Sequence, residues 1–343
     1  MEVKFLIVGD PHIQVSNIKE VELFLDSLIN LATEKKPDRI ILLGDLLHNH
    51  ERIHTIALNK AYQLVNDMRL IAKTYILVGN HDYISNQQYL TDNHWMNGLK
   101  EWDNTIIVDQ VITETINGNK FVFAPYVYPG RFIEALNTLH TSWQDADCIF
   151  AHQEFAGCKM GAITSVEGDN WSLENPNIIS GHIHSRQMPQ PNIYYPGAAM
   201  QHAFGESKKN IISFATFNNG KYTNQEIDLK LPRKKTIYLD VEDIDQYVLP
   251  TTKDTIKLTV SGNYEQFKAL KRTKKYKELT KKGTKIVFKP KKITHQPKNS
   301  SESTKFTNIL KDLIIQDKNP YLCQVYELIV NNKTTKVDDI MFL

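Results

Sequence analysis

The sequence predicts an α/β protein built around a parallel sheet, with a smaller second domain. Apolar runs of strand length at 3–9, 39–43 and 76–78 alternate with amphipathic stretches at 18–32 and 56–71. This β-α-β-α-β order predicts parallel strands with helices packed on the sheet. In the second amphipathic stretch, the residues expected to face the sheet are Ile56, Leu64, Met68 and Ile71.

Short strands dominate the next part of the chain. Segment 83–104 is polar and aperiodic, so we expect a functional loop with a short helix near 93–100. Asn117-Gly118 predicts a hairpin turn, and 154–171 is expected to be irregular. The further strands are expected at 105–108, 111–116, 121–125, 147–151, 177–181, 193–195, 211–217 and 222–229, with a helix at 130–139. These elements predict two sheets packed together, with helices outside.

The composition changes after Arg233, where a second domain is expected. Its strands are predicted at 236–241, 255–261 and 285–288, with one helix at 264–279, which makes a small β-α-β unit. Polar residues then predict a linker, and two apolar segments at 306–315 and 321–330 have helical periodicity. The expected divisions are 1–232, 233–293, the linker at 294–305, and a C-terminal helical segment at 306–343.

Apolar run length and cysteine usage limit the class of protein. The chain has 343 residues, and its longest apolar runs are of strand length, so no membrane span is expected. Three cysteines without CxxC spacing fit a reducing compartment and argue against a disulfide framework or a thiolate zinc site. With no signal-peptide pattern, the expected location is the cytoplasm, or the host cytoplasm for a viral protein.

Charge is distributed unevenly along the chain. The net charge is only +2, but residues 253–298 contain 15 Lys and Arg against 3 Asp and Glu, a net charge of +12. Such a cluster is typical of a surface that contacts a nucleic-acid backbone, and a solvated basic face is the alternative. Nothing resembles a base-reading motif, so contact would be independent of base sequence. The candidate DNA-binding residues are Lys268, Lys271, Arg272, Lys274, Lys275, Lys281 and Lys282.

Polar side chains follow five of the apolar strands at the same end. In open α/β sheets, ligands bind at the carboxyl ends of the strands. Carboxylate, amide and imidazole donors without thiolates suit divalent ions such as manganese or iron, and zinc less exclusively. The candidate ligands, taken in chain order, are Asp10, His12, Asp45, Asn80, His152, His182 and His184.

Seven donors exceed the needs of one tetrahedral ion. They match two adjacent divalent ions that share the Asp45 carboxylate. Two such ions can clamp the attacking and leaving oxygens of a phosphoryl transfer and make a bridging hydroxide available near neutral pH. Manganese is the first choice for both ions, and magnesium, iron and zinc are the alternatives.

The clusters resemble the five motifs of the calcineurin-like metallophosphoesterases, in order, across residues 7–184. The resemblance implies a four-layer αββα sandwich with a two-metal centre. It implies that His81 protonates the leaving oxygen or stabilises the phosphorane, that Asp82 orients the His81 ring, and that a metal-bridging hydroxide attacks phosphorus. The implied ligands are Asp10, His12, Asp45 and His184 for one metal, and Asp45, Asn80, His152 and His182 for the other.

Within that family, Gly44-Asp45-Leu46-Leu47-His48 is most similar to the second motif of the SbcD-type DNA repair exonuclease subunit. The resemblance implies that His48 helps to place a DNA end and that the β-α-β unit at 255–289 is a DNA-capping domain. The stretch at 195–206 is also similar, whereas 49–54 lacks the proline-serine common in that branch. The resemblance implies DNA as a partner, and an SbcC-type SMC-like ATPase held by the C-terminal helices. Packing of these helices on the body of the protein is the alternative, and a second copy of the chain is a further candidate partner.

The expected function is therefore that of a dinuclear-metal phosphodiesterase acting on DNA, as an exo- or endonuclease in repair, recombination or replication. One alternative is a phosphoesterase for small phosphate esters or cyclic nucleotides. The other is a non-catalytic scaffold of the same family, against which the complete motif set argues, because a scaffold has no need of His81.

Overall fold

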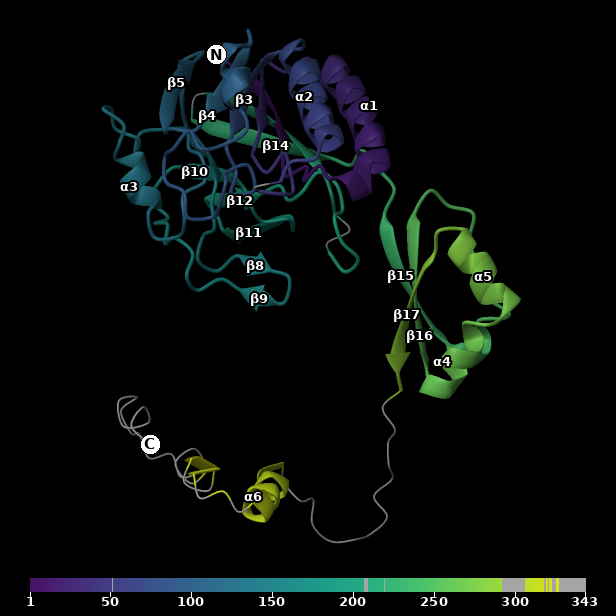
Figure 1. Cartoon of the computed structure of the whole chain (residues 1–343). Coiled ribbons are helices and arrows are strands. Elements are labelled where there is room, and N and C mark those ends of the chain that lie inside the picture. The colour runs from purple at the N-terminus through teal and green to yellow at the C-terminus, as the bar shows by residue number, and fades with distance from the viewer. Residues whose placement is uncertain are drawn as a thin grey trace. The chain divides into compact units, whose positions relative to one another are not determined.

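The computed structural model describes residues 1–50, 52–206, 209–218, 220–291 and 306–317, and the single residues 319, 321, 322, 325 and 326. The chain divides into two units, Met1–Pro290 and Lys291–Leu343, and Figure 1 labels many of their elements. The division expected between residues 232 and 233 lies within the first unit and stays a prediction.

One six-stranded sheet joins four parallel strands to an antiparallel edge pair. β1 to β4 run parallel, as the alternation of strands and helices predicts. β1 also pairs with β13, which runs antiparallel to it. The sheet order is β14-β13-β1-β2-β3-β4, with β1 at Val3–Val8, β2 at Arg39–Leu42, β3 at Lys73–Leu77, β4 at Thr105–Val108, β13 at Ile212–Asn218 and β14 at Lys221–Ile227.

The second six-stranded sheet has a parallel centre of four strands. Asn117 and Gly118 have φ angles of 53° and 81° and form the predicted hairpin turn between β5 and β6. β11 was not expected from the sequence because it contains Pro189, which a sheet tolerates at an edge. The order is β11-β12-β10-β7-β6-β5, with β5 at Ile112–Ile116, β6 at Asn119–Phe123, β7 at Cys148–His152, β10 at Asn177–Gly181, β11 at Gln187–Gln190 and β12 at Ile193–Tyr195.

Three apolar clusters separate four layers. One lies between the first sheet and the helices α1 (Ile18–Lys35) and α2 (Thr55–Arg69). A second lies between the two sheets, where the Phe5 ring centroid is 4.8 Å from that of Phe121. A third covers the outer face of the second sheet and includes α3 (Phe132–Leu136). The predicted αββα arrangement is therefore confirmed.

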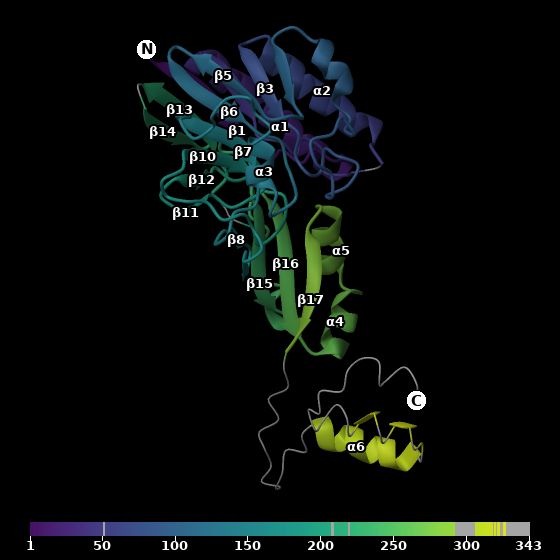
Figure 2. The same ribbon diagram turned by 90° about the vertical axis from the view of Figure 1, so that its left-hand side faces the viewer.

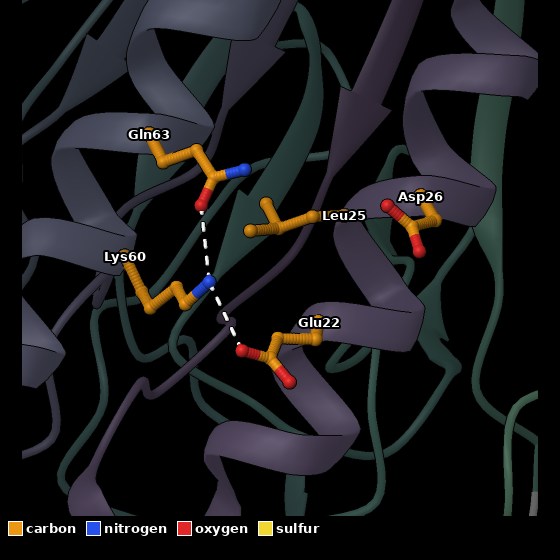
Figure 3. Close-up of a pocket in the computed structure, with 5 residues that line it drawn as sticks. All are labelled: Glu22, Leu25, Asp26, Lys60 and Gln63. Carbon is orange, nitrogen blue, oxygen red and sulfur yellow. Dashed lines mark hydrogen bonds and ion pairs between the residues drawn. The ribbon is translucent and has the colours of Figure 1, made fainter.

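α1 and α2 pack side by side on the first sheet. Leu25 is buried beneath their contact, and Lys60 of α2 reaches Glu22 of α1 at 3.2 Å and Gln63 at 3.2 Å (Figure 3). Exposed ion pairs contribute little to stability. The apolar face, more than this ion pair, therefore holds the two helices to the sheet.

Several predicted elements differ in extent or orientation. Ile56 was expected to face inward, but it is half-exposed because it lies in the first turn of α2, before the buried face that begins at Ala57. The helix expected at 130–139 is limited to α3. The short helix expected near 93–100 is a 3-10 helix at Asn97–Glu101. The segment expected to be irregular contains a small hairpin, β8 (Lys159–Met160) and β9 (Ile163–Thr164).

The basic region forms a three-stranded parallel sheet in the order β15 (Lys234–Asp240), β16 (Thr255–Gly262) and β17 (Lys285–Pro290). Figure 2 shows helices α4 (Tyr264–Leu270) and α5 (Lys274–Lys281) on one face of this sheet. A single helix was predicted here, and that prediction is wrong. The Thr273 side chain accepts a hydrogen bond from the Tyr276 amide at 3.1 Å and so begins a new helix. We call residues 234–290 the basic cap.

The second unit contains α6 (Phe306–Asp317), which agrees with the helix predicted at 306–315. The linker predicted at 294–305 lies outside the described residues, as do Cys323 and most of the helix predicted at 321–330. Every helix in the part of the chain that the structure describes is too short or too polar to traverse a bilayer.

Candidate metal centre

The carboxyl ends of five strands carry the candidate ligands to one edge of the two sheets. In the first sheet, Val8, Leu42 and Ile76 are aligned across three parallel strands, so the residues that follow them emerge together. In the second sheet, Gly181 pairs with His152. The residues that come shortly after these strand ends in the chain include Asp10, Asp45, Asn80 and His182.

Asp10, His12 and His184 form the first cluster. Their ligand atoms lie within 4.8 Å of one another. The Nε2 atoms of His12 and His184 face each other at 2.9 Å. His12 is buried, and burial lowers the pKa of its imidazole well below the usual range. The neutral imidazole is the form that binds a metal ion.

Asn80, His152 and His182 form the second cluster, together with Asp45. The Asn80 Oδ1 atom lies 3.1 Å from His152 Nε2 and 2.9 Å from His182 Nδ1. His152 Nδ1 lies 2.7 Å from the Leu43 carbonyl, which can only accept a hydrogen bond. Nδ1 therefore carries the hydrogen, and Nε2 is directed into the cluster.

Asp45 spans the two clusters. Its Oδ1 atom lies 3.4 Å from His152 Nε2, and its Oδ2 atom lies 3.4 Å from His12 Nε2. Although burial opposes ionisation, the nearby His152 holds the pKa of the Asp45 carboxyl well below its usual range. Asp45 is therefore an ionised carboxylate with one oxygen toward each group of imidazoles, which is the position of a bridging ligand.

The backbone around the candidate ligands is closely packed and strained. A Cβ atom on Gly181 would lie 2.6 Å from Asp10 Oδ1, and one on Gly79 would overlap the Asp45 carboxylate. Asp10, His12 and Asp45 have φ angles of 27°, 44° and 50°, in the left-handed region that L-residues rarely adopt. Strained residues of this kind concentrate at functional sites.

Asp10 tests whether these residues fit divalent cations. Both of its carboxylate oxygens are buried and have no hydrogen-bond partner among the described residues. Burial raises the pKa of this carboxyl group. A buried carboxylate without a partner is costly unless a cation lies beside it. The oxygen and imidazole donors around it are those that divalent transition metals accept, so the residues fit two such ions.

His81 lies beside the clusters, and the side chain predicted to orient its ring does not do so. His81 Nδ1 lies 2.6 Å from the His48 carbonyl, so Nδ1 donates and Nε2 is the nitrogen left for a substrate. The prediction that Asp82 orients this ring is wrong. Asp82 instead accepts hydrogen bonds from the backbone amides of Leu46 and Gly79 and from Trp95 Nε1.

Asp82 therefore organises the loops that carry the ligands. The Asp82 side chain is buried beneath the turns that follow β2 and β3. The hydrogen bonds that its carboxylate accepts connect those turns to each other and to the loop at 83–104. Burial, with the Asp45 charge nearby, raises the pKa of Asp82 to about 7.

The rings of His12, His48 and His50 lie around His81, the catalytic candidate. The His81 ring is nearly parallel to that of His48, with centroids 5.4 Å apart, and to that of His50, with centroids 4.6 Å apart. His50 Nδ1 also lies 3.2 Å from the Tyr83 carbonyl. His48 thus lies beside His81, and its implied role in placing a DNA end stays a prediction, whereas His50 was not recognised as a site residue. The alternation of His48 and His50 was the available signal.

His202 and Glu206 were also missed as site residues. Glu206 Oε1 lies 3.3 Å from His184 Nδ1, and its Oε2 accepts from the backbone amides of His202 and Ala203. His202 Nε2 lies 2.9 Å from the Asp10 carbonyl. The His184 hydrogen bond and the backbone amides hold the pKa of Glu206 down to about 2 against the effect of burial. The available signal was the resemblance at 195–206, which does not indicate which residues these side chains contact.

Comparisons with known proteins support a phosphoesterase. Residues 3–186 match the family model described as "Calcineurin-like phosphoesterase". The chain is 47% identical over 277 residues to "Putative phosphoesterase 244L" of Invertebrate iridescent virus 6, covering 79% of this chain and 98% of that protein. It is 45% identical over 287 residues to "Putative phosphoesterase 078R" of Invertebrate iridescent virus 3, covering 82% of this chain and 83% of that protein.

Among solved structures, the chain resembles a novel archaeal phosphodiesterase with a TM-score of 0.34 and 14% identity, covering 65% of this chain and 99% of that one. The match to the family model covers more than half of the chain and contains all seven candidate ligands. The chain belongs to the calcineurin-like phosphoesterase family.

Proposed function

We propose that this protein is a phosphodiesterase that uses two divalent metal ions and acts on DNA. The observation that supports the metal-dependent part is the position of Asp45, with one carboxylate oxygen toward His12 and the other toward His152. Manganese is the preferred ion because the donors are oxygens and imidazoles. When bound, two such ions would supply the Lewis acidity that polarises a phosphate and makes water nucleophilic.

Each of the two clusters of candidate ligands would hold one ion. Asp10, His12 and His184 would hold one ion, and Asn80, His152 and His182 the other, with Asp45 between them. The Leu43 carbonyl orients His152, and the Glu206 carboxylate orients His184. Such outer contacts set the direction of a ligand nitrogen and raise its basicity.

His81 is the candidate proton donor to the leaving oxygen. Its Nδ1–H is held by the His48 carbonyl, so only Nε2 can carry a proton to or from the substrate. Burial lowers the pKa of this imidazole, and an anionic phosphodiester beside it would oppose that effect. General acid catalysis by a positioned side chain typically contributes about 10²–10⁴-fold.

The basic cap supports DNA as the substrate. Six of the seven candidate contacts on α4, α5 and their ends are exposed, and Lys275 is half-buried. Among the described residues, Lys268, Arg272, Lys274 and Lys281 form no ion pair, so their charges remain available to phosphates. The cap also contacts the segment that carries Glu206, because the Lys234 amide donates to Gln201 Oε1 at 2.7 Å.

A direct assay tests this proposal. With manganese, the protein should digest blunt duplex DNA or single-stranded circular DNA and should also hydrolyse bis-p-nitrophenyl phosphate. Hydrolysis of the small ester without digestion of either DNA would favour a small-ester phosphoesterase. Failure on all three substrates, with two metal ions bound, would favour the scaffold and end the proposal.

His81→Ala separates catalysis from metal binding. The variant should bind the same amount of manganese as the wild type and lose turnover, because His81 is not one of the seven candidate ligands and its Nδ1 atom is held by the His48 carbonyl. Metal content measured after gel filtration is the control. Equal losses of metal and turnover would contradict the role of His81 as proton donor.

A partner for the second unit is a separate proposal. α6 exposes Leu313 and Ile315 to solvent, and the SbcD-type resemblance implies an SbcC-type ATPase as the occupant, with a second copy of the chain as the alternative. Light scattering of the purified chain should give the monomer mass alone if the occupant is a different protein.

A further inference from the structure

A groove of about 890 Å³ opens beside both clusters of the candidate metal centre. Its lining includes His182 of one cluster and His184 of the other. The β8–β9 hairpin and the segment that contains Phe204 and Glu206 also line it. The groove is large enough to bury a ligand of nucleotide size. A substrate phosphate at the metal centre would therefore place its neighbouring group here.

The hairpin wall is fixed to the second sheet. The Lys159 amide donates to Gln187 Oε1 at 2.7 Å, and Gln187 Nε2 donates to the Lys159 carbonyl at 2.9 Å. These two bonds attach β8 to β11. The turn at Gly161 has a φ of 65°, which glycine adopts without strain. The wall is thus positioned by the scaffold, and its Met160 and Lys159 side chains remain exposed.

The opposite wall is anchored at both ends. Glu206 is held by His184 and by the amides of His202 and Ala203. Phe204 lies beneath the Lys257 ammonium of β16, 4.8 Å from its ring centroid. The Phe204 ring therefore lines the groove beside the candidate ligands and also contacts the basic cap.

The lining matches the chemistry of a nucleoside. Phe204 offers an aromatic face, and Met160 offers a polarizable apolar surface that adapts to a partner's shape. Lys159 forms no ion pair among the described residues, so its charge is available to a phosphate. The one carboxylate in the wall, Glu206, is already engaged by hydrogen bonds. An apolar flat group flanked by phosphates is what these residues would accept.

We propose that this groove binds the nucleoside adjacent to the scissile phosphate, with its base against Phe204 and Met160. This inference rests on the proposed phosphodiesterase activity and adds a substrate subsite to it. Base stacking on an aromatic side chain tolerates any base, which agrees with the lack of a base-reading motif.

Two phosphodiesters that differ in the adjacent group provide the test. Thymidine 5′-(p-nitrophenyl phosphate) carries a nucleoside, whereas methyl p-nitrophenyl phosphate carries only a methyl group that cannot stack, and both release p-nitrophenolate. The quantity to compare is the ratio of kcat/KM for the thymidine ester to kcat/KM for the methyl ester. Phe204→Ala should lower this ratio about tenfold, since stacking on one aromatic side chain is worth roughly 1–3 kcal/mol per base.

Two further variants test whether a change in the ratio comes from lost stacking at Phe204 or from a general disturbance of the protein. Phe204→Trp should keep the ratio at or above the wild-type value because the larger ring also stacks. Tyr264→Ala, which removes an exposed aromatic ring in the basic cap that does not line the groove, should leave the ratio unchanged. The same manganese content in all variants confirms that the centre is intact.

The outcomes separate this inference from the function on which it rests. If the wild type hydrolyses neither ester, the phosphodiesterase proposal fails. If it hydrolyses both and Phe204→Ala leaves the ratio unchanged, the subsite is overturned while the activity stands. If the ratio also falls in Phe204→Trp as much as in Phe204→Ala, the residue acts through packing and the proposed stacking is wrong.

Discussion

At the scale of single residues, Asp10 is a buried carboxylate whose ionised form a bound cation would stabilise. Neither of its oxygens has a hydrogen-bond partner among the described residues. Asp10→Asn removes the charge and keeps the shape, so the metal-free variant should be more stable than the metal-free wild type. A gain of about 1 kcal/mol would raise Tm by roughly 2–4 °C for a domain of this size. Thermal unfolding of both proteins in excess chelator measures this difference in Tm.

Once metal is added, the wild type is expected to be more stable than the Asp10→Asn variant. Manganese should raise the Tm of the wild type much more than that of Asp10→Asn, because an ion that binds the folded state more tightly stabilises it more. Asp26→Asn is the matched control, since Asp26 is exposed on α1 and lines no ligand cluster. A metal-free Asp10→Asn protein that melts below the wild type would contradict the assignment of Asp10 as an uncompensated ligand.

His50 is expected to position the His81 ring. Its own ring lies nearly parallel to that of His81, with centroids 4.6 Å apart. An aromatic pair contributes roughly 0.5–1.5 kcal/mol, so His50→Ala should lower kcat by about twofold to tenfold, with little change in KM. His50→Phe keeps a flat ring and should restore most of the loss. Steady-state kinetics on bis-p-nitrophenyl phosphate measures both.

A purely structural role for His50 would give a different result. If His50 acts only through its contact with the Tyr83 carbonyl, His50→Phe should be as impaired as His50→Ala. His140→Ala serves as the control because this histidine is exposed and belongs to no ligand cluster. Manganese content should be equal in all of these proteins.

The identities of the candidate ligands could be predicted from the sequence, but their backbone geometry could not. Strand ends followed by Asp, Asn or His indicate one edge of a sheet. Nothing in the residue types shows that Asp10 and Asp45 have positive φ angles, because aspartate is also common in ordinary turns. The contact of Glu206 with His184 joins residues 22 positions apart through a loop without periodicity, so no local pattern reports it.

At the scale of elements, the Asp109 carboxylate helps to attach the loop at 83–104 to the scaffold. Asp109 follows β4, and its Oδ2 atom lies 3.1 Å from His94 Nε2 and 2.5 Å from Lys100 Nζ. Burial alone would raise the pKa of Asp109, but these two donors hold it below the usual value of 3.8. The ionised form is therefore more favoured in the folded state than in the unfolded state.

This shift determines how the stability contribution of Asp109 depends on pH. Because the folded-state pKa is depressed, the contribution is fully present above the unfolded-state pKa of about 3.9 and is lost as pH falls through the folded-state pKa. Asp109→Asn should thus lower the urea midpoint of the metal-free protein at pH 5, and the difference from the wild type should shrink below pH 4. Asp103→Asn, an exposed change in the same loop, should have no such effect. A difference that grows as the pH falls would contradict the prediction.

Elements with strong periodicity were predictable, and those that depend on a single capping or edge contact were not. α1 and the strands of the first sheet follow from apolar spacing. The division of the cap helix depends on Thr273, whose side chain can cap a helix or lie within one. The β8–β9 hairpin has two residues in each strand, which is too few for alternation to be visible.

At the scale of the whole molecule, the excess positive charge and the candidate metal ligands lie in different parts of the chain. The basic cap carries most of the excess positive charge, whereas the body contains the candidate ligands. Charge asymmetry was visible in the sequence because it depends only on composition. DNA as the substrate stays a prediction, since a basic surface attracts any polyanion.

The salt dependence of DNA binding tests the role of the cap. Each phosphate that the protein neutralises contributes about −0.9 to the slope of log K against log salt concentration for duplex DNA. Neutralising Lys271, Arg272, Lys274 and Lys275 to Gln should therefore make the slope shallower by up to about 3.6. Fluorescence anisotropy with a labelled duplex, titrated between low and moderate salt, measures the slope for each protein.

A matched variant distinguishes the cap from net charge alone. Neutralising Lys19, Lys36, Lys221 and Lys230, which are exposed outside the cap, removes the same four charges. If the cap holds the phosphates, this control should keep the wild-type slope and lose affinity only slightly through the weaker long-range field. Equal slopes in the two variants would mean that DNA contacts the body of the protein instead. Because the candidate ligands lie in the body, both variants should still hydrolyse bis-p-nitrophenyl phosphate at the wild-type rate, so binding and chemistry can be measured separately in one set of proteins.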